Sequence, residues 1–211
     1  LDTLGKENVL AVTARSETYP ADEERDAVRF ASEICARHRF VNTKELANPL
    51  FAANPPERCF YCKDELFGRL KKMAAPKKMA VVDGANLSDA SDFRPGSIAV
   101  KKWGVVSPLR EAGITKEEIR SLSRSLKISS YKKPSQACLS SRIPYGEDID
   151  PVKLRMIERG EKFLRKYVKG NVRVRIIKNT TARIEVDVPE IKKLIAAKTR
   201  KKILSRLHAL G

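Results

Sequence analysis

Two cysteines lie two residues apart in the segment NPPERCFYCKDELF, at Cys59 and Cys62. Such a Cys-x-x-Cys pair occurs in thioredoxin-like redox sites and as one half of a tetrahedral zinc site. A zinc site needs two further ligands, and the histidines are poor candidates, since His38 lies in an expected helix and His208 in the C-terminal tail. Cys138, in the polar loop KPSQACLSSRIPYG, would complete three thiolates, which suit an iron–sulfur cluster with one iron open to an exogenous ligand. From spacing alone, these three chemistries and a metal-free set of thiols stay open.

Oxygen-bearing side chains follow an apolar run in the segment VVDGANLSDASDFRPG. Asp83 and Gly84 end that run, and Asn86, Asp89 and Asp92 come next. Carboxylate and amide oxygens at the carboxyl end of a strand suit Mg²⁺ with a nucleotide, or a ribose. An ordinary Asx-rich turn explains the segment equally well.

A third set of polar residues suits an anion. Ser141 and Arg142, in SSRIPYG, offer a hydroxyl and a guanidinium to a phosphate. Arg173 and Arg175 alternate with valines, so both lie on one face of an expected strand, and Glu185 on the partner strand is a potential cation ligand. A strand with alternating arginines is also typical of a solvated surface.

The elements that must carry these residues alternate between strand and helix patterns in the first part of the chain. This alternation predicts an α/β fold with a parallel sheet, helices on both faces, and ligands at the carboxyl ends of the strands. Helical spacing over 20–38 places Cys35 in the core, and Thr115 with Glu118 predicts a capping box. The expected strands are Val9 to Thr13, Phe40 with Val41, and Met79 to Val82, and the expected helices are Pro20 to His38, 60–73 and Thr115 to Leu126.

The pattern changes after Pro151. A helix to about Lys169 precedes two alternating runs, NVRVRII and ARIEVDV, which predict a hairpin with one buried and one charged face. A basic helical tail follows. We therefore predict two domains, residues 1–147 and a smaller α+β domain over residues 148–211.

Composition limits the class of protein. The 211 residues are 42% hydrophobic and 33% charged, which is typical of a globular protein. Neither an apolar run of about 20 residues nor a secretory signal is visible, and four cysteines in a chain of this length do not resemble a disulfide framework, so we expect a cytoplasmic protein. The net charge is +17, and residues 151–211 hold 18 Lys or Arg against 5 Asp or Glu, a net of +13. This imbalance indicates an anionic partner, either a phosphorylated small molecule or nucleic acid. The alternative is a lysine-rich surface that only contacts solvent.

Five segments together resemble one family. They are similar to segments of the LarE family, whose members are ATP-dependent sulfur transferases of the PP-loop ATP pyrophosphatase superfamily. In chain order, the five segments are NPPERCFYCK, DGANLSDASDFRPG, GVVSPLREAGITKEEIRSLS, KPSQACLSSRIPYG and RVRIIKNTTARIEV. The resemblance covers nearly the whole chain, and the loop around Cys138 is its most specific part.

The resemblance implies a reaction in the biosynthesis of the nickel-pincer nucleotide cofactor. With ATP and Mg²⁺, such an enzyme adenylates a carboxylate of a pyridinium biscarboxylate mononucleotide and converts it to a thiocarboxylate. Some members sacrifice the sulfur of a cysteine at the position of Cys138. Others hold a [4Fe-4S] cluster with that cysteine and two more, at the positions of Cys59 and Cys62, and this sequence has all three. The resemblance also implies a homo-oligomer.

Site residues follow from the matching motifs. Cys138 and Lys63 are the implied catalytic residues, with Lys63 close to the substrate carboxylate. Other residues are implied to contact the ligands. Backbone groups of Ala14, Arg15 and Ser16 would meet the adenine, and Asp83, Gly84 and Asn86 would meet Mg²⁺ and the nucleotide. Ser141 and Arg142 would bind a phosphate, and Arg173, Arg175 and Glu185 would line the nucleotide end of the site.

One expected motif is absent from the sequence. The Ser-Gly-Gly-x-Asp-Ser loop, which cradles pyrophosphate with backbone N–H groups in this superfamily, is expected just before Leu1. Two alternatives to the sulfur transferase remain open. One is a tRNA thiolase of the same superfamily, which suits the basic C-terminal region, and the other is a non-catalytic basic binding module.

Overall fold

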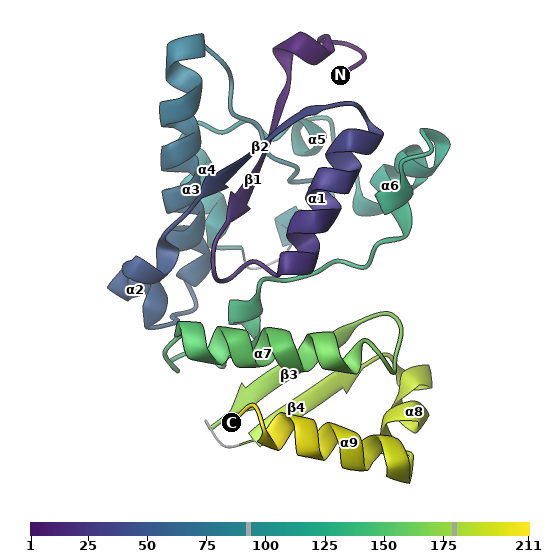
Figure 1. Ribbon diagram of the computed structural model, residues 1–211. Coiled ribbons are helices and arrows are strands. Elements are labelled where there is room, and N and C mark those ends of the chain that lie inside the picture. The colour runs from purple at the N-terminus through teal and green to yellow at the C-terminus, as the bar shows by residue number, and fades with distance from the viewer. Residues whose placement is uncertain (92–93, 179–180) are drawn as a thin grey trace. The chain divides into compact units, whose positions relative to one another are not determined.

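The chain forms two compact units in the computed structural model, which describes residues 1–91, 94–178 and 181–211 (Figure 1). The N-terminal unit comprises Leu1–Phe51 and Pro55–Lys133, and the C-terminal unit comprises Ala52–Asn54 and Pro134–Gly211. The predicted boundary lay between residues 147 and 148. Residues 134–147 instead belong to the C-terminal unit, together with a short segment from much earlier in the sequence.

A parallel strand pair organises the N-terminal unit. Strand β1 (Leu10–Arg15) pairs with β2 (Arg37–Asn42), with Val12 opposite Arg39, and helix α1 (Ala21–Glu33) connects them. Figure 1 shows α1 on one side of this pair and α3 (Arg58–Ala74) on the other. The mixed α/β class and the parallel pairing are thus confirmed.

The sheet is smaller than predicted. Within the described residues, the segment expected as a strand at Met79 to Val82 forms only an isolated parallel bridge, between Val82 and Val106. The Val106 N–H donates to the carbonyl of Val81, and the Asp83 N–H donates to that of Val106. The two-stranded β1–β2 sheet and this bridge therefore replace the larger sheet that the sequence suggested.

The prediction of a helix from Pro20 to His38 is wrong at its C-terminal end. Helix α1 ends at Glu33, and Cys35 adopts a left-handed conformation (φ 54°). The Ala36 N–H donates to the carbonyl of Ala31, which is the bond that closes a Schellman motif. Cys35 is consequently exposed rather than in the core. His38 lies in β2, where its Nε2 is 2.9 Å from the hydroxyl of Thr13.

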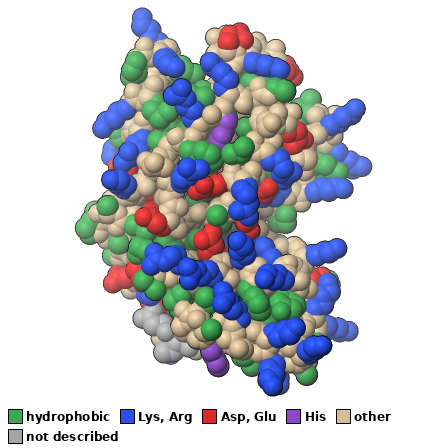
Figure 2. Space-filling model, viewed as in Figure 1, with side chains coloured by type: hydrophobic (Ala, Val, Ile, Leu, Met, Phe, Trp, Pro, Cys, Tyr) green, Lys and Arg blue, Asp and Glu red, His purple; other side chains and the backbone are tan. Residues whose placement is uncertain are grey.

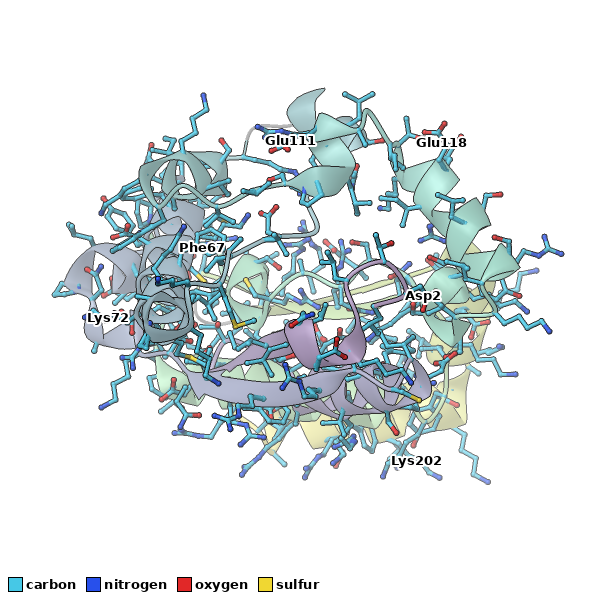
Figure 3. The ribbon with its side chains drawn as sticks, turned by 90° about the horizontal axis from the view of Figure 1, so that it is seen from above. Asp2, Phe67, Lys72, Glu111, Glu118 and Lys202 are labelled. Atoms are coloured by element: carbon cyan, nitrogen blue, oxygen red, sulfur yellow. The ribbon has the colours of Figure 1, made fainter. Side chains whose placement is uncertain are left out.

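Helix α3 supplies much of the N-terminal core. Seen from above in Figure 3, Phe67 lies on its inner side and Lys72 on its outer side. Phe67 is 3% exposed and packs with α4 (Gly96–Lys102), where Ala99 is fully buried. The α3 prediction over 60–73 is confirmed with slightly wider bounds. The remaining helices of this unit are α5 (Pro108–Glu111) and α6 (Lys116–Ser125), with α2 (Pro49–Ala52) at the edge of the unit.

Helix α6 begins as predicted. The Thr115 hydroxyl accepts from the Glu118 N–H, and the Glu118 carboxylate accepts from the Thr115 N–H, so the capping box is complete. Short 3₁₀ helices complete the elements: Lys6–Asn8, Glu45–Ala47, Ala75–Lys77, Leu87–Ser91, Ser129–Lys132, Leu139–Arg142 and Val188–Glu190.

The C-terminal unit is built on an antiparallel hairpin. Strand β3 (Val172–Ile177) pairs with β4 (Thr181–Val186) as the predicted hairpin, with Val174 opposite Ile184. The apolar face packs against helices α7 (Pro151–Leu164), α8 (Ile191–Ile195) and α9 (Ala197–His208). Val172 and Leu164 are completely buried there. The opposite face carries the charged residues, as the alternation predicted.

Asn54 explains why residues 52–54 belong to the C-terminal unit. Its side chain is fully buried, and Nδ2 lies 3.2, 2.6 and 3.1 Å from the carbonyl oxygens of Ile143, Pro144 and Glu147. The backbone adds bonds from Gly146 N–H to the Asn54 carbonyl and from Ile149 N–H to that of Ala52. The turn after Arg142 is therefore held by a residue some ninety positions earlier.

Basic side chains cover much of the surface. On the face shown in Figure 2, Lys and Arg side chains lie over both units, and few acidic side chains separate them at the α9 edge. In the part of the chain that the structure describes, no helix is both long and apolar enough to cross a membrane.

We expect Asn54→Ala to lower the free energy of unfolding by about 1–3 kcal/mol, because buried carbonyls lose their donor and alanine is strained at φ 53°. Asn54→Gly loses the same amide without that strain, so it separates the two causes. Urea unfolding followed by circular dichroism measures both variants. A glycine variant as stable as wild type would show that the amide contributes nothing.

Candidate functional site

The first turns of α3 present the paired cysteines. Cys59 and Cys62 are three positions apart on the helix, so they lie on one side of it, and Lys63 follows directly. Cys59 is exposed and Cys62 is half-buried, and both are thiols rather than members of a disulfide. Gly96, at the start of α4, packs against this turn, because a Cβ there would be 2.8 Å from Lys63 Cδ and 3.3 Å from the Cys59 carbonyl oxygen.

Lys63 and Asp83 meet in the N-terminal unit. Lys63 Nζ is 3.6 Å from Asp83 Oδ2, and Asp83 Oδ1 accepts from the Ser107 hydroxyl at 2.7 Å and from the Ala85 N–H at 3.1 Å. Asp83 is thus fixed at the end of the segment that bridges to Val106. Gly84 is exposed, with open space where a side chain would be.

Asn86 adds an acceptor near this position. Its backbone N–H donates to Asp89, whose other carboxylate oxygen is 2.8 Å from Arg94 Nη2. The side-chain oxygen of Asn86 is buried and has no donor among the described residues. Asp92, the third acceptor suggested by the sequence, lies outside the described residues.

The end of β1 is held by a buried carboxylate. The hydroxyls of Ser16 and Thr18 donate to Glu45 Oε1 at 2.5 and 2.7 Å, and Glu45 is only 2% exposed. Arg15 pairs with Glu24 at 2.8 Å, and its carbonyl accepts from the Thr43 N–H. Ala14 pairs with Val41 in the sheet. The three residues predicted at the adenine thus follow one another at the carboxyl end of β1.

In the C-terminal unit, Cys138 immediately precedes the 3₁₀ turn Leu139–Arg142 and is half-buried. Its carbonyl accepts from Ser141 Oγ at 2.8 Å, from the Ser141 N–H at 3.1 Å and from Arg142 Nη1 at 3.1 Å. Arg142 is 1% exposed and pairs with Glu161 of α7, with Nε and Oε1 2.8 Å apart. Sequence reasoning predicted Ser141 and Arg142 for a phosphate, and the structure ties both to Cys138.

The charged face of the hairpin connects to the same loop. Arg175 Nη1 donates to the Ser141 carbonyl at 2.6 Å, and Arg175 Nε donates to Glu185 at 2.8 Å. Partial burial by itself raises the pKa of Glu185, but the hydrogen bond and charge of Arg175, together with Arg183, bring that pKa below its ordinary value of 4.5. The Nε of Arg173 is buried and has no acceptor within the described part of the chain.

Each unit therefore gathers its own set of predicted residues. The N-terminal unit holds Cys59, Cys62 and the Lys63–Asp83 pair, and the C-terminal unit holds Cys138. Within either unit, no three described His, Cys, Asp or Glu side chains gather as a metal site. A cluster held by these three cysteines therefore stays a prediction.

Sequence reasoning missed the two buried glutamates. Glu161 falls on the buried stripe of α7, between Ile157 and Leu164, and a charged residue within an apolar helical stripe is a signal that could have revealed it. Glu45 lies in a short 3₁₀ turn, Glu45–Ala47, where no periodic pattern marks it.

Gly96→Ala tests the packing beneath the cysteine turn. We expect it to lower the free energy of unfolding by about 1 kcal/mol, because the Lys63 side chain can move aside but the added methyl group would still lie 3.3 Å from the Cys59 carbonyl oxygen. Gly84→Ala is the matched control, since a Cβ at that position would meet no other atom within 4 Å. Urea denaturation measures both, and equal stabilities of the two variants would contradict the close approach of α4 to α3.

The chain is similar over most of its length to proteins from three microorganisms. It is 43% identical over 195 residues to an uncharacterised protein of Synechocystis sp., which covers 92% of this chain and 72% of the relative. It is 32% identical over 212 residues to pyridinium-3,5-bisthiocarboxylic acid mononucleotide synthase of Lactiplantibacillus plantarum, covering 100% of this chain and 76% of the synthase. An uncharacterised protein of Methanocaldococcus jannaschii is 35% identical over 160 residues, 75% of this chain and 63% of the relative.

No protein-family profile matches the chain. The similarity to the Lactiplantibacillus synthase nevertheless extends over every segment that carries the candidate residues, from the carboxyl end of β1 to the β3–β4 hairpin. At this identity and coverage, the chain belongs to the LarE family, that of pyridinium-3,5-bisthiocarboxylic acid mononucleotide synthase.

Proposed function

We propose that the protein is an ATP-dependent sulfur transferase that converts a carboxylate of a pyridinium biscarboxylate mononucleotide to a thiocarboxylate. The observation that carries this proposal is the 32% identity to the bisthiocarboxylic acid mononucleotide synthase over the full length of the chain. A PP-loop fold for the N-terminal unit is part of the proposal, and the parallel β1–β2 pair with its connecting helix supports it.

The chemistry needs two transfers. A free carboxylate has no good leaving group, so one of its oxygens first attacks the α-phosphorus of ATP, and pyrophosphate leaves. A sulfur nucleophile then attacks the acyl carbon of the adenylate, and AMP leaves with the original carboxylate oxygen. The products are AMP, pyrophosphate and the thiocarboxylate.

Residues of the N-terminal unit suit the nucleotide. Asp83 and Asn86 offer oxygens to Mg²⁺, and the buried Asn86 oxygen, which has no donor among the described residues, favours a cation there. Ala14, Arg15 and Ser16 would contact the adenine with backbone groups, and Gly84 leaves room beside Asp83. Lys63, within 3.6 Å of Asp83, would lie close to the substrate carboxylate and offset its charge.

Residues of the C-terminal unit suit the substrate phosphate. Arg173 carries a buried donor without an acceptor in the described ranges, which a phosphate oxygen would satisfy. Arg175 and Ser141 would contribute from the same region, and Glu185 holds the Arg175 guanidinium in place. A phosphate-binding role for Arg142 stays a prediction.

Cys59, Cys62 and Cys138 would hold a [4Fe-4S] cluster. Thiolates are the ligands that such clusters take, and two cysteines one helical turn apart at the N-terminal end of a helix fit two of the positions. When bound, the cluster supplies an iron that presents sulfur to the activated carboxylate. The remaining alternative for sulfur is Cys138 itself, consumed in a single turnover.

A tRNA thiolase is the second candidate function. It is favoured by the composition of α9, in which Lys198, Arg200, Lys201, Lys202 and Arg206 are exposed and no acidic residue occurs. Steeply salt-dependent tRNA binding would support it. A cytoplasmic location and a homo-oligomeric state stay predictions.

The activity is tested by incubating the chain anaerobically with ATP, Mg²⁺, sulfide and the pyridinium biscarboxylate mononucleotide. We expect thiocarboxylate and AMP in equal amounts by liquid chromatography and mass spectrometry. The Cys138→Ala variant should form no thiocarboxylate, because both sulfur routes use that thiol. AMP formation with tRNA but not with the mononucleotide would instead support the thiolase.

Iron content tests the cofactor. Anaerobic reconstitution with iron and sulfide should give about four irons per chain, and Cys59→Ser should lose most of them. Cys35→Ser is the matched control, since that exposed cysteine lies at the end of α1 and should leave the iron content unchanged. A wild-type chain that binds one zinc, or that loses H₂S from Cys138 in one turnover, would overturn the cluster proposal.

A further inference from the structure

We infer that Glu161, acting through Arg142, is a positioning residue that fixes the peptide of Cys138 for sulfur chemistry. The inference rests on the proposed function only for the use of the Cys138 sulfur; the contacts themselves lie within the C-terminal unit. It gives Arg142 a role different from the phosphate ligand that its motif implies.

All three nitrogens of the Arg142 guanidinium donate to groups of the protein itself. Its side chain has no exposed surface, and its Nε and Nη2 donate to the two oxygens of Glu161 at 2.8 and 3.3 Å. Its Nη1 is shared among the carbonyl of Ala137 at 2.8 Å, the carbonyl of Cys138 at 3.1 Å and the hydroxyl of Ser141 at 2.9 Å. A phosphate could reach Nε or Nη1 only by displacing these partners.

The Cys138 peptide is consequently held on both sides. Arg142 binds the carbonyl that precedes Cys138 and the carbonyl of Cys138 itself. Ser141 adds two donors to the Cys138 carbonyl, its hydroxyl and its N–H. A carbonyl oxygen has two lone pairs, so this acceptor is saturated and its orientation is fixed. Cys138 is itself only half-buried.

Glu161 fixes the position of Arg142. It lies on α7, is 1% exposed, and accepts from the Val174 N–H of β3 at 3.1 Å as well as from Arg142. One carboxylate therefore joins the Cys138 loop to the strand that carries Arg173 and Arg175. The partner charge also allows Arg142 to stay ionised in the interior, where an unpaired guanidinium would be costly.

Glu161, Arg142 and Ser141 together form a clamp on the peptide of Cys138. The clamp matters because a sulfur atom reacts efficiently only when it is held at a defined place relative to the acyl carbon. Without Glu161, the buried Arg142 loses its counter-charge and the peptide around Cys138 is free to move. The effect should then appear in the reactivity of Cys138 and in turnover, and not in the affinity for the mononucleotide phosphate.

The test compares three variants of the 211-residue chain after removal of iron. Glu161→Gln breaks the ion pair, and the double variant Arg142→Met with Glu161→Leu removes it while keeping an apolar interior, so at least one variant is expected to fold. Arg165→Gln is the control, because Arg165 also pairs with Glu161, at 3.5 Å, but does so from the partly exposed end of α7. Circular dichroism establishes folding.

Two readouts need no substrate. The first is the rate at which iodoacetamide modifies Cys138, followed on its proteolytic peptide, and the second is hydrogen exchange in residues 137–142. We expect both to rise by about tenfold in the Glu161→Gln and double variants, and to stay at the wild-type value in Arg165→Gln. Wild-type rates in both folded pair variants would overturn the inference.

Kinetics separate positioning from phosphate binding. We expect kcat for thiocarboxylate formation to fall by up to about 100-fold in the pair variants with little change in KM for the mononucleotide. Arg173→Lys should instead raise that KM and leave the alkylation of Cys138 unchanged. A raised KM with unchanged Cys138 reactivity in the pair variants would make Arg142 a phosphate ligand. If the wild-type chain transfers no sulfur, the alkylation and exchange results still decide whether the clamp exists.

Discussion

The buried ion pair between Arg142 and Glu161 is the interaction that joins loop, helix and strand in the C-terminal unit. Two charges that leave water must recover the lost hydration from each other and from the protein, and here backbone carbonyls and a strand N–H supply the remaining partners. Such a pair adds little net stability compared with apolar residues of the same volume. It specifies instead which loop, helix and strand lie together, because any other arrangement leaves a charge unpaired in the interior.

Local patterns in the sequence were sufficient for part of the fold. The alternation in β3 and β4 predicted the hairpin and its buried face, and Thr115 with Glu118 predicted the start of α6, since each depends on residues close in sequence. The apolar spacing over 20–38 failed because it continues past a left-handed Cys35, which the pattern of residue types does not reveal. The segment before Asp83 looks like a strand, but whether it enters a sheet depends on partners far along the chain.

The candidate site, like the fold, could be predicted from the sequence only in part. Motifs predicted roles for the cysteines, the Asp83 turn and the arginines of β3, because residue type and spacing carry that chemistry, and these roles stay predictions. They could not show that Arg142 is enclosed, since its counter-ion lies 19 residues later on a helix. Nor could they separate the Cys59–Cys62 pair from Cys138 into different compact units. Burial and long-range pairing decide which charged side chains meet a ligand and which only support the backbone.

The position of Asn54 has a genetic consequence. The C-terminal unit is not one uninterrupted stretch of sequence, because residues 52–54 belong to it although N-terminal residues flank them on both sides. A gene fragment that encodes residues 134–211 would therefore lack the side chain that ties the turn after Arg142. A gene segment that carries this unit intact must begin at residue 52 or earlier, so it also carries residues 55–133 of the N-terminal unit.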